Sequence, residues 1–230
     1  CRMSGVEVGT AGLPAEGHSL STRHPTSDTL LPALPTGTVT FLMTDIEGST
    51  ALWEEVGSAF PAVLASHHAL LRGLFRRHGG HEVKELGDGF LVAFQGAGNA
   101  VACAMALQRA LTTHAWPQIA KPLSDPLRVR LALHTGEAQP DQGDYRTLVL
   151  HLTQRLLAVG HGGQILCSEA TSILLRRDPV PGAHLLDLGE YLLPGLSEAH
   201  RLFQITYPGM EPERFPPPRG EARTAGHLPP

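Results

Sequence analysis

Two aspartates occupy positions where a carboxylate needs a specific explanation. Asp45 follows residues 38–44, an apolar and β-branched run that is typical of a buried strand. Asp88 lies between two glycines, a pattern that favours a tight turn between strands and would by itself explain that acid. Asp45 is less easily explained, because an unpaired carboxylate at the end of a buried strand costs several kcal/mol. If the first strand pairs beside the hairpin, the hard oxygens of both acids suit Mg²⁺ or Mn²⁺ at one end of the sheet.

The elements that would position these acids alternate between strands and helices. The pattern of apolar and turn-forming residues predicts strands over 38–44, 81–86, 90–94, 127–137, 184–192 and 201–206, and helices over 59–77, 99–112 and 147–159. A polar, flexible segment is expected over 138–146. This order predicts an α+β, ferredoxin-like fold with a mainly antiparallel sheet, and flanking helices packed on one face of it.

Composition narrows the class of protein. The length of 230 residues suits one domain with tails, and residues 1–36 and 208–230 are rich in the residues of disordered or linker segments. We therefore expect a disordered leader (1–36), an ordered domain (37–207) and a Pro-rich tail or linker (208–230). The three cysteines are far apart, which argues against a disulfide framework or a cysteine zinc site.

Charge and hydropathy bear on partners and location. A net charge of −4 and an aromatic content of 5% argue against direct binding of nucleic acid, because phosphate favours basic surfaces and bases favour aromatic platforms. The sequence has neither a run of about 18 apolar residues nor a signal-peptide pattern, so we expect no membrane partner and a cytoplasmic location.

Three stretches resemble the catalytic domains of class III adenylate and guanylate cyclases of the bacterial type. They are residues 39–50, 84–90 and 128–137, and the shorter segments 161–166 and 187–190 fit the same family. The resemblance covers nearly all of residues 37–207, and the order and spacing of the motifs are more specific than any one of them. It implies the cyclase form of the ferredoxin-like fold and a homodimer whose sites combine residues of both subunits.

The resemblance also implies site roles. Asp45, Asp88 and the backbone carbonyl of Ile46 would hold two Mg²⁺ or Mn²⁺ ions in one subunit. The ribose 3′-hydroxyl of a nucleoside triphosphate would then attack the α-phosphorus, and pyrophosphate would leave. Lys84 and Asp144 of the partner would read the base. A lysine donor facing N1 and a carboxylate facing the exocyclic amine favour adenine, hence ATP as substrate and cyclic AMP as product. Ordinary solvated charges remain the alternative for this pair.

Two residues on the predicted helix 147–159 complete the implied site. His151 falls on the position that binds the ribose and orients its 3′-hydroxyl, and Arg155 falls on the position that stabilises charge on the α-phosphate in the transition state. Arg155 lies four residues after His151, so both project from one helix face. An apolar stripe is expected to pack the helix against the domain: Leu148, Leu152, Leu156 and Val159.

The sequence departs from the family pattern in the half that would bind substrate. His151 replaces an asparagine, Thr147 replaces a glycine at the helix entry, and Pro194 replaces a lysine that binds the triphosphate. Proline supplies neither a charge nor an N–H. Two interpretations follow: an adenylate cyclase of low activity, or a catalytically impaired cyclase-homology domain that acts as a nucleotide-binding or dimerising regulatory module.

Overall fold

The computed structural model describes residues 33–117, 127–210 and 214–223. The strands are β1 (Gly37–Ile46), β2 (His81–Leu86), β3 (Gly89–Phe94), β4 (Val129–Ala138), β5 (Pro140–Asp141), β6 (Asp144–Tyr145), β7 (Ile165–Ser168), β8 (His184–Leu192), β9 (Ala199–Thr206) and β10 (Glu221–Arg223). The helices are α1 (Ser49–Val56), α2 (Phe60–Arg77), α3 (Ala97–Thr113), α4 (Leu148–Val159) and α5 (Glu169–Arg177), with a 3₁₀ turn at Gly57–Ala59.

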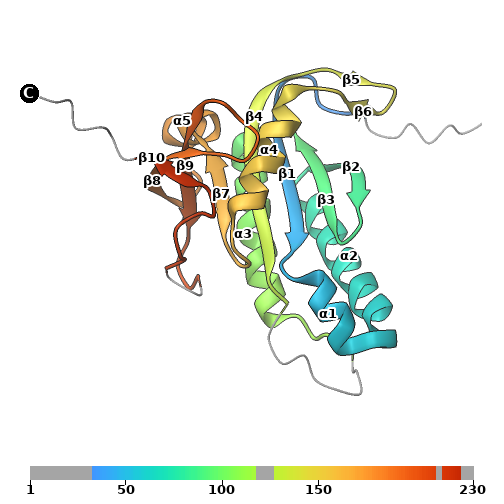
Figure 1. Ribbon diagram of the computed structural model, residues 1–230. Helices are drawn as coiled ribbons and strands as arrows, with labels where there is room; N and C mark the ends of the chain where they lie inside the picture. Colours follow the sequence, from blue (N-terminus) through green and yellow to red (C-terminus); the bar gives the residue numbers. More distant parts are fainter. Residues whose placement is uncertain (1–32, 118–126, 211–213, 224–230) are drawn as a thin grey trace, which may run out of the picture. The chain divides into compact units, whose positions relative to one another are not determined.

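One sheet of eight strands organises the domain, in the order β10-β8-β9-β7-β4-β1-β3-β2 (Figure 1). The part β4-β1-β3-β2 has the strand order of a ferredoxin-like unit, and its neighbours are antiparallel. The pairing of β4 with β7 is parallel, and the remaining neighbours are antiparallel. The predicted α+β fold with a mainly antiparallel sheet is therefore confirmed.

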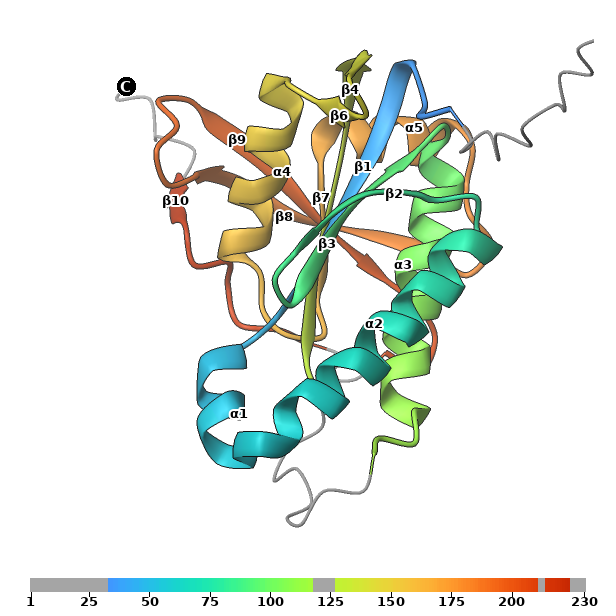
Figure 2. The same cartoon turned by 90° about the vertical axis from the view of Figure 1, so that its right-hand side faces the viewer.

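Both faces of the sheet carry helices. Side chains of β1 alternate between them, because successive residues of a strand point to opposite sides. Leu42 and Ile46 join a core cluster with residues of α2, α3 and α5. Phe41 and Met43 join a second cluster, against which residues of α4 pack. Figure 2 shows α4 on one side of the sheet and α2 and α3 on the other. The expectation that the helices share one face was wrong for α4.

Several short elements were not anticipated from the sequence. Helix α1 buries none of its residues and begins after Gly48, which has a φ of 72° and makes no side-chain cap. The segment predicted to be flexible contains the hairpin β5–β6, whose turn residues Gln142 and Gly143 both have positive φ. This conformation suits the right-handed twist of a two-residue hairpin. Helix α5 is capped by Ser168, whose hydroxyl accepts from the Thr171 amide.

The segment after residue 210 also contributes to the sheet. Strand β10 forms three residue pairs with β8, so the end of the described chain lies against the domain. No helix of the described residues is long and apolar enough to cross a membrane.

Candidate active site

Asp45 lies directly opposite Arg130, across the pairing of β1 and β4. The Arg130 side chain donates from Nε to Asp45 Oδ2 over 3.0 Å and from a terminal nitrogen to the same oxygen. Both side chains are mostly buried, with 28% of the Asp45 side chain and 20% of the Arg130 side chain exposed. The acid at the strand end therefore has a cationic partner, which offsets part of the cost of burying it.

Asp88 reaches the same strand end through an unusually close approach of backbone. A Cβ at Gly89 would lie 1.8 Å from the carbonyl oxygen of Thr44, so only glycine fits there. The Thr44 hydroxyl also accepts a hydrogen bond from the Phe90 amide, at 3.0 Å. These contacts bring Asp88 Oδ2 within 3.3 Å of the Ile46 amide, which donates to it. The structure thus brings Asp45, Ile46 and Asp88 together, as expected from the sequence.

The charges around Asp45 oppose one another. Burial raises its pKa, the hydrogen bond and charge of Arg130 lower it, and the nearby carboxylates of Asp88 and Glu47 raise it again; the balance is a raised pKa. A carboxylate pair with excess negative charge favours a divalent cation, and Arg130 supplies the positive charge in its place. The donor set of two carboxylates and a backbone carbonyl fits Mg²⁺ or Mn²⁺.

The acids supply only part of a coordination shell. Among the described residues, no group of three or more His, Cys, Asp or Glu side chains is arranged to hold a metal ion. Mg²⁺ sites that act on nucleotides commonly use one or two carboxylates and leave the other positions to water and phosphate oxygens. The residues present therefore fit an ion that is bound together with a nucleotide.

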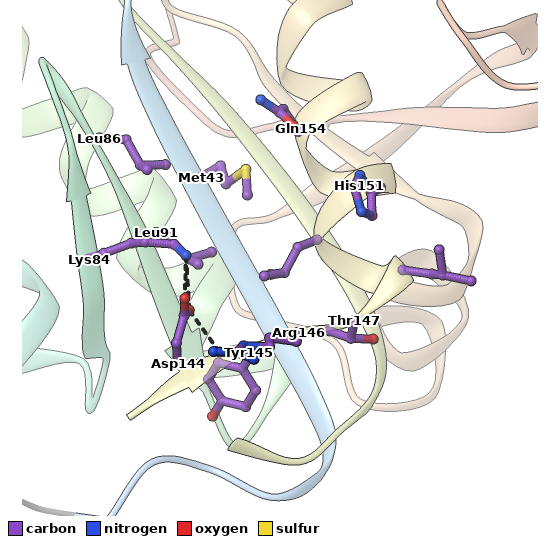
Figure 3. Close-up of a pocket in the computed structure, with 12 residues that line it drawn as sticks. Met43, Lys84, Leu86, Leu91, Asp144, Tyr145, Arg146, Thr147, His151 and Gln154 are labelled. Carbon is purple, nitrogen blue, oxygen red and sulfur yellow. Dashed lines mark hydrogen bonds and ion pairs between the residues drawn. The ribbon is translucent and has the colours of Figure 1, made fainter. Parts of the chain in front are cut away.

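A separate pocket of about 590 Å³ lies between strands β2 and β3 on one side and helix α4 on the other (Figure 3). Its polar lining includes Lys84 on β2 and Asp144 on β6, which the structure brings together across 60 residues of sequence. Lys84 Nζ lies 3.0 Å from Asp144 Oδ1 and 2.7 Å from Oδ2. The Tyr145 amide also donates to Asp144 Oδ1 over 2.7 Å. The hydrogen bond from Lys84 lowers the pKa of Asp144, so this carboxyl is ionised near neutral pH.

The strand that carries Asp144 is anchored by its neighbour. Tyr145 is buried and packs edge-to-face with the Phe41 ring, with ring centroids 4.8 Å apart, and its hydroxyl donates to the Pro35 carbonyl. The next residues enter α4 without a glycine. Thr147 has an extended φ of −145° and its hydroxyl accepts from the Val149 amide, so it caps the helix. The missing glycine therefore does not prevent Asp144 from meeting Lys84.

Helix α4 places His151 and Arg155 differently. His151 lines the pocket and is exposed, whereas Arg155 is outside the pocket lining. Instead, the Arg155 guanidinium lies beside the turn after β8, where a Cβ on Gly195 would be 3.5 Å from one of its terminal nitrogens. That turn contains Pro194, so the structure brings together the predicted transition-state arginine and the position where the family lysine is replaced.

The apolar stripe of α4 is only partly as predicted. Leu156 and Val159 are buried and Leu152 packs against the same cluster, which confirms those three positions. The prediction for Leu148 was wrong, because this residue is 83% exposed and lies at the rim of the pocket. It lies in the first turn of the helix, where the next residue, Val149, packs against the cluster around β1, so Leu148 points away from the sheet.

Arg130 was not recognised from the sequence as a site residue. A usable signal was present, because Arg130 interrupts the apolar strand that also holds Val129 and Leu131. The reasoning that singled out Asp45 applies equally to a cation in a buried strand. What the sequence lacked was the strand register that places the two opposite each other.

Comparison with known proteins agrees with this geometry. The sequence profile of the adenylate and guanylate cyclase catalytic domain matches residues 31–207. An uncharacterized protein of Mycobacterium tuberculosis is 36% identical over 187 residues, which cover 80% of this chain and 61% of that protein. The chain thus spans about three fifths of this relative. The receptor-type adenylate cyclase GRESAG 4.3 of Trypanosoma brucei brucei is 31% identical, over 76% of this chain and 17% of that protein.

Solved structures show the same fold. An adenylate cyclase of Trypanosoma brucei in its monomeric state superposes with a TM-score of 0.71 at 30% identity, over 82% of this chain and 96% of that one. The adenylyl cyclase CyaB of P. aeruginosa superposes with a TM-score of 0.61 at 22% identity, over 74% of this chain and 94% of that one.

Proposed function

Because the chain belongs to the family of adenylate and guanylate cyclase catalytic domains, we propose that it converts ATP to 3′,5′-cyclic AMP and pyrophosphate in a homodimer. In this reaction the ribose 3′-oxygen forms a bond to the α-phosphorus, and the bond from that phosphorus to the pyrophosphate oxygen breaks. The observation that carries the proposal is the Lys84–Asp144 pair in the pocket. Adenylate cyclases among the relatives support the same choice of substrate.

The pair has the donor and acceptor pattern that adenine requires. Lys84 would donate to N1 of the base, and Asp144 would accept from the exocyclic amine. Guanine presents a donor at N1 and an acceptor at O6, so it would face the wrong partner at both positions. The two side chains are 40% and 42% exposed, and an ion pair so exposed contributes about 0–1 kcal/mol. A base can therefore take over their hydrogen bonds at small cost.

The acids would serve the reacting phosphate. Asp45, Asp88 and the Ile46 carbonyl would hold Mg²⁺ or Mn²⁺, which supplies charge neutralisation at the phosphates and lowers the pKa of the 3′-hydroxyl. Asp45 would exchange its ion pair for the metal, which frees the Arg130 guanidinium beside the bound triphosphate. A planar cation at that place suits phosphate oxygens.

A homodimer would join the two halves of the site. The pocket that holds Lys84 and Asp144 includes neither Asp45 nor Asp88 in its lining. Two large apolar side chains at its rim are exposed, Leu86 at 45% and Leu148 at 83%. Their burial by a second subunit is favourable, at about 25 cal/mol per Å². A partner placed over this rim would bring its own acids to the nucleotide.

A second function is favoured by one observation, the proline at position 194. The turn beside Arg155 offers no second cation for the triphosphate, since Pro194 and Gly195 stand there. In this alternative the domain binds nucleotide or dimerises and regulates another activity, with little turnover. His151, in place of an amide, would weaken the positioning of the 3′-hydroxyl, which is worth on the order of 10²-fold in rate.

The test is a cyclase assay of the purified chain with Mn²⁺ and either ATP or GTP. Adenylate cyclase activity predicts cyclic AMP from ATP, little product from GTP, and loss of product in Asp45→Ala. The exposed Asp178→Ala is the matched control and should retain activity. No product from wild type or from His151→Asn, together with measurable ATP binding, would favour the regulatory module instead.

A further inference from the structure

The last described segment of the chain, residues 214–223, wraps back onto the domain, and we call it the C-terminal strap. Its final residues form β10, which pairs with β8 at the edge of the sheet (Figure 1). Near its start, Phe215 packs against the main hydrophobic core. The Pro217 carbonyl accepts a hydrogen bond from the ring of His161, at 3.0 Å. The strap is therefore held at both ends and in its middle.

Arg219 connects the strap to two parts of the proposed site. Its backbone amide donates to the carbonyl of Val159, the last residue of α4, over 2.9 Å. Its guanidinium donates to Glu47 Oε1 over 2.5 Å. Helix α4 carries His151 and Arg155, whereas Glu47 directly follows Asp45 and Ile46 in the chain. Arg219 thus contacts both helix α4, which carries two of the proposed substrate-binding residues, and Glu47, which follows the proposed metal ligands.

Glu47 is held tightly on its other sides. Its backbone amide donates to the Arg128 carbonyl over 2.9 Å, and the Arg128 side chain donates to the Gly162 carbonyl over 2.8 Å. A Cβ at Gly162 would lie 2.6 Å from both Glu47 Oε2 and the Arg128 Cβ, so these two side chains pack closely around the glycine. Arg219 closes this arrangement from the side where the strap passes, and only 23% of the Glu47 side chain is exposed.

We propose that the C-terminal strap positions residues 45–48, which include the proposed metal ligands, with Arg219 acting as a positioning residue through Glu47. This inference rests on the proposed function, because it takes Asp45 and the Ile46 carbonyl as metal ligands. A shift of Glu47 moves the preceding peptide, and that peptide contains the Ile46 carbonyl. Groups that orient metal ligands from behind commonly change metal affinity about 10- to 100-fold when they are removed.

A merely structural role of Arg219 predicts a different outcome. An ion pair with a 46% exposed arginine contributes little to stability, and its loss would leave the metal dependence unchanged. A positioning role predicts a change in metal dependence that is large compared with the change in stability. The two readings therefore separate in one pair of measurements.

The experiment compares wild type, Arg219→Ala, Arg219→Lys and the control Arg223→Ala, which alters an exposed arginine of the same strap. The first measurement is the Mn²⁺ concentration that gives half-maximal cyclic AMP formation at saturating ATP. The second is hydrogen exchange of the amides of residues 45–48 in the metal-free protein. We expect Arg219→Ala to raise the half-saturating Mn²⁺ about 10-fold and to speed exchange of the Glu47 amide. Arg219→Lys should recover part of both effects, and Arg223→Ala should change neither.

The results separate a failure of this proposal from a failure of the proposed function. Unchanged Mn²⁺ dependence in an active Arg219→Ala protein would overturn the positioning role, whatever happens to exchange. If wild type makes no cyclic AMP, the proposed function fails, and hydrogen exchange alone then decides whether the strap holds the turn. Unchanged exchange in Arg219→Ala would overturn the strap proposal in that case too.

Discussion

The guanidinium of Arg130 donates twice to a single oxygen of Asp45, the residue directly opposite it on the neighbouring strand. A cross-strand pair of opposite charges is favourable. Here it also opposes the effect of burial and of two nearby carboxylates, which raise the pKa of Asp45. Arg130 therefore favours the ionised form of Asp45 in the metal-free protein, and in the proposed function a metal ion would take the place of Arg130.

Replacement of Arg130 should move the acid limb of the pH–activity profile. Burial raises the pKa of Asp45 and Arg130 lowers it, so Arg130→Met raises this pKa further. A carboxyl group binds a cation only when deprotonated, so activity should fail at a higher pH in the variant than in wild type. The measurement is Mn²⁺-dependent cyclic AMP formation between about pH 5 and pH 8. An acid limb that stays in place, or moves to lower pH, would contradict this assignment of Asp45.

The close approach at Gly89 makes a second prediction. In Gly89→Ala the new methyl group would lie 1.8 Å from a backbone oxygen that cannot move alone, so the β2–β3 hairpin must shift away from β1. We expect the free energy of unfolding to fall by about 1–3 kcal/mol. If Asp88 moves with the hairpin, Mn²⁺ should bind more weakly, and the half-saturating Mn²⁺ concentration should rise.

Gly96→Ala is the matched control for that variant. Gly96 has a φ of −134° and open space around its Cβ position, so alanine should be tolerated. Urea unfolding and the half-saturating Mn²⁺ concentration check both proteins. Equal behaviour of the two variants would show that the contact with Thr44 does not hold Asp88 in place.

The sequence predicted most of the central sheet because its signals there are local. The β-branched run before Asp45 and the Gly-Asp-Gly turn each mark their element without knowledge of the rest of the chain. Strand β10 could not be found in this way, since its three residues are all exposed and pair through backbone alone. Helix α1 likewise has no fully buried residue.

Prediction of the site was limited by register and by the surroundings of each side chain. Lys84 and Asp144 were linked only through the family resemblance, and the structure brings them into contact. The partnership of Arg130 with Asp45 depends on which residues of β1 and β4 lie opposite, which no local pattern specifies. The exposure of Leu148 depends on which face of the first turn of α4 lies against the sheet.

Lys84 should matter for activity much more than for stability. In Lys84→Met an ion pair between half-exposed side chains is lost, which should change the free energy of unfolding by no more than about 1 kcal/mol. Loss of a charged hydrogen bond to the base should lower kcat/KM for ATP about 10- to 100-fold and weaken the preference for ATP over GTP.

The ion pair of Arg201 with Asp187 provides the control for Lys84. Its side chains are 48% and 39% exposed, close to the values of the Lys84–Asp144 pair, and it lies outside the lining of the pocket that holds Lys84 and Asp144. Arg201→Met should therefore reproduce the small change in stability and leave kcat/KM unchanged. An equal loss of activity in both variants would mean that Lys84 does not read the base.

His67 predicts a dependence of stability on pH. It is fully buried, and neither ring nitrogen has a hydrogen-bond partner among the residues that the structure describes. Burial, with a smaller contribution from His68, lowers its pKa to about 4. The unfolded chain therefore binds a proton first as the pH falls from about 6.5 towards 4, and the free energy of unfolding falls in that window, by on the order of 3 kcal/mol in all.

His67→Leu should remove this part of the pH dependence. A leucine removes both unpartnered nitrogens of His67 from the core, so stability at pH 7 should be equal to or greater than that of wild type. His134, whose pKa is also lowered to about 4 by burial, remains in both proteins, and the difference between them isolates His67. The measurement is the free energy of unfolding from urea titrations at pH 7 and at pH 5. If this free energy changes equally between the two pH values in variant and wild type, the prediction is contradicted.

A site composed of two subunits should allow two inactive variants to complement each other. Asp45→Ala lacks the metal half, and the double variant Lys84→Met with Asp144→Ala lacks the base-reading half. After subunit exchange in an equal mixture, half of the dimers are mixed, and each of these has one intact site and one doubly damaged site. Cyclic AMP formation should therefore recover to about a quarter of the wild-type rate, as two-fold symmetry requires.

A mixture of Asp45→Ala with Asp88→Ala damages the same half in every site and should stay inactive. Because the pocket lining of one chain contains neither acid, failure of the first mixture after proven exchange would mean that the chain must rearrange to build a complete site alone.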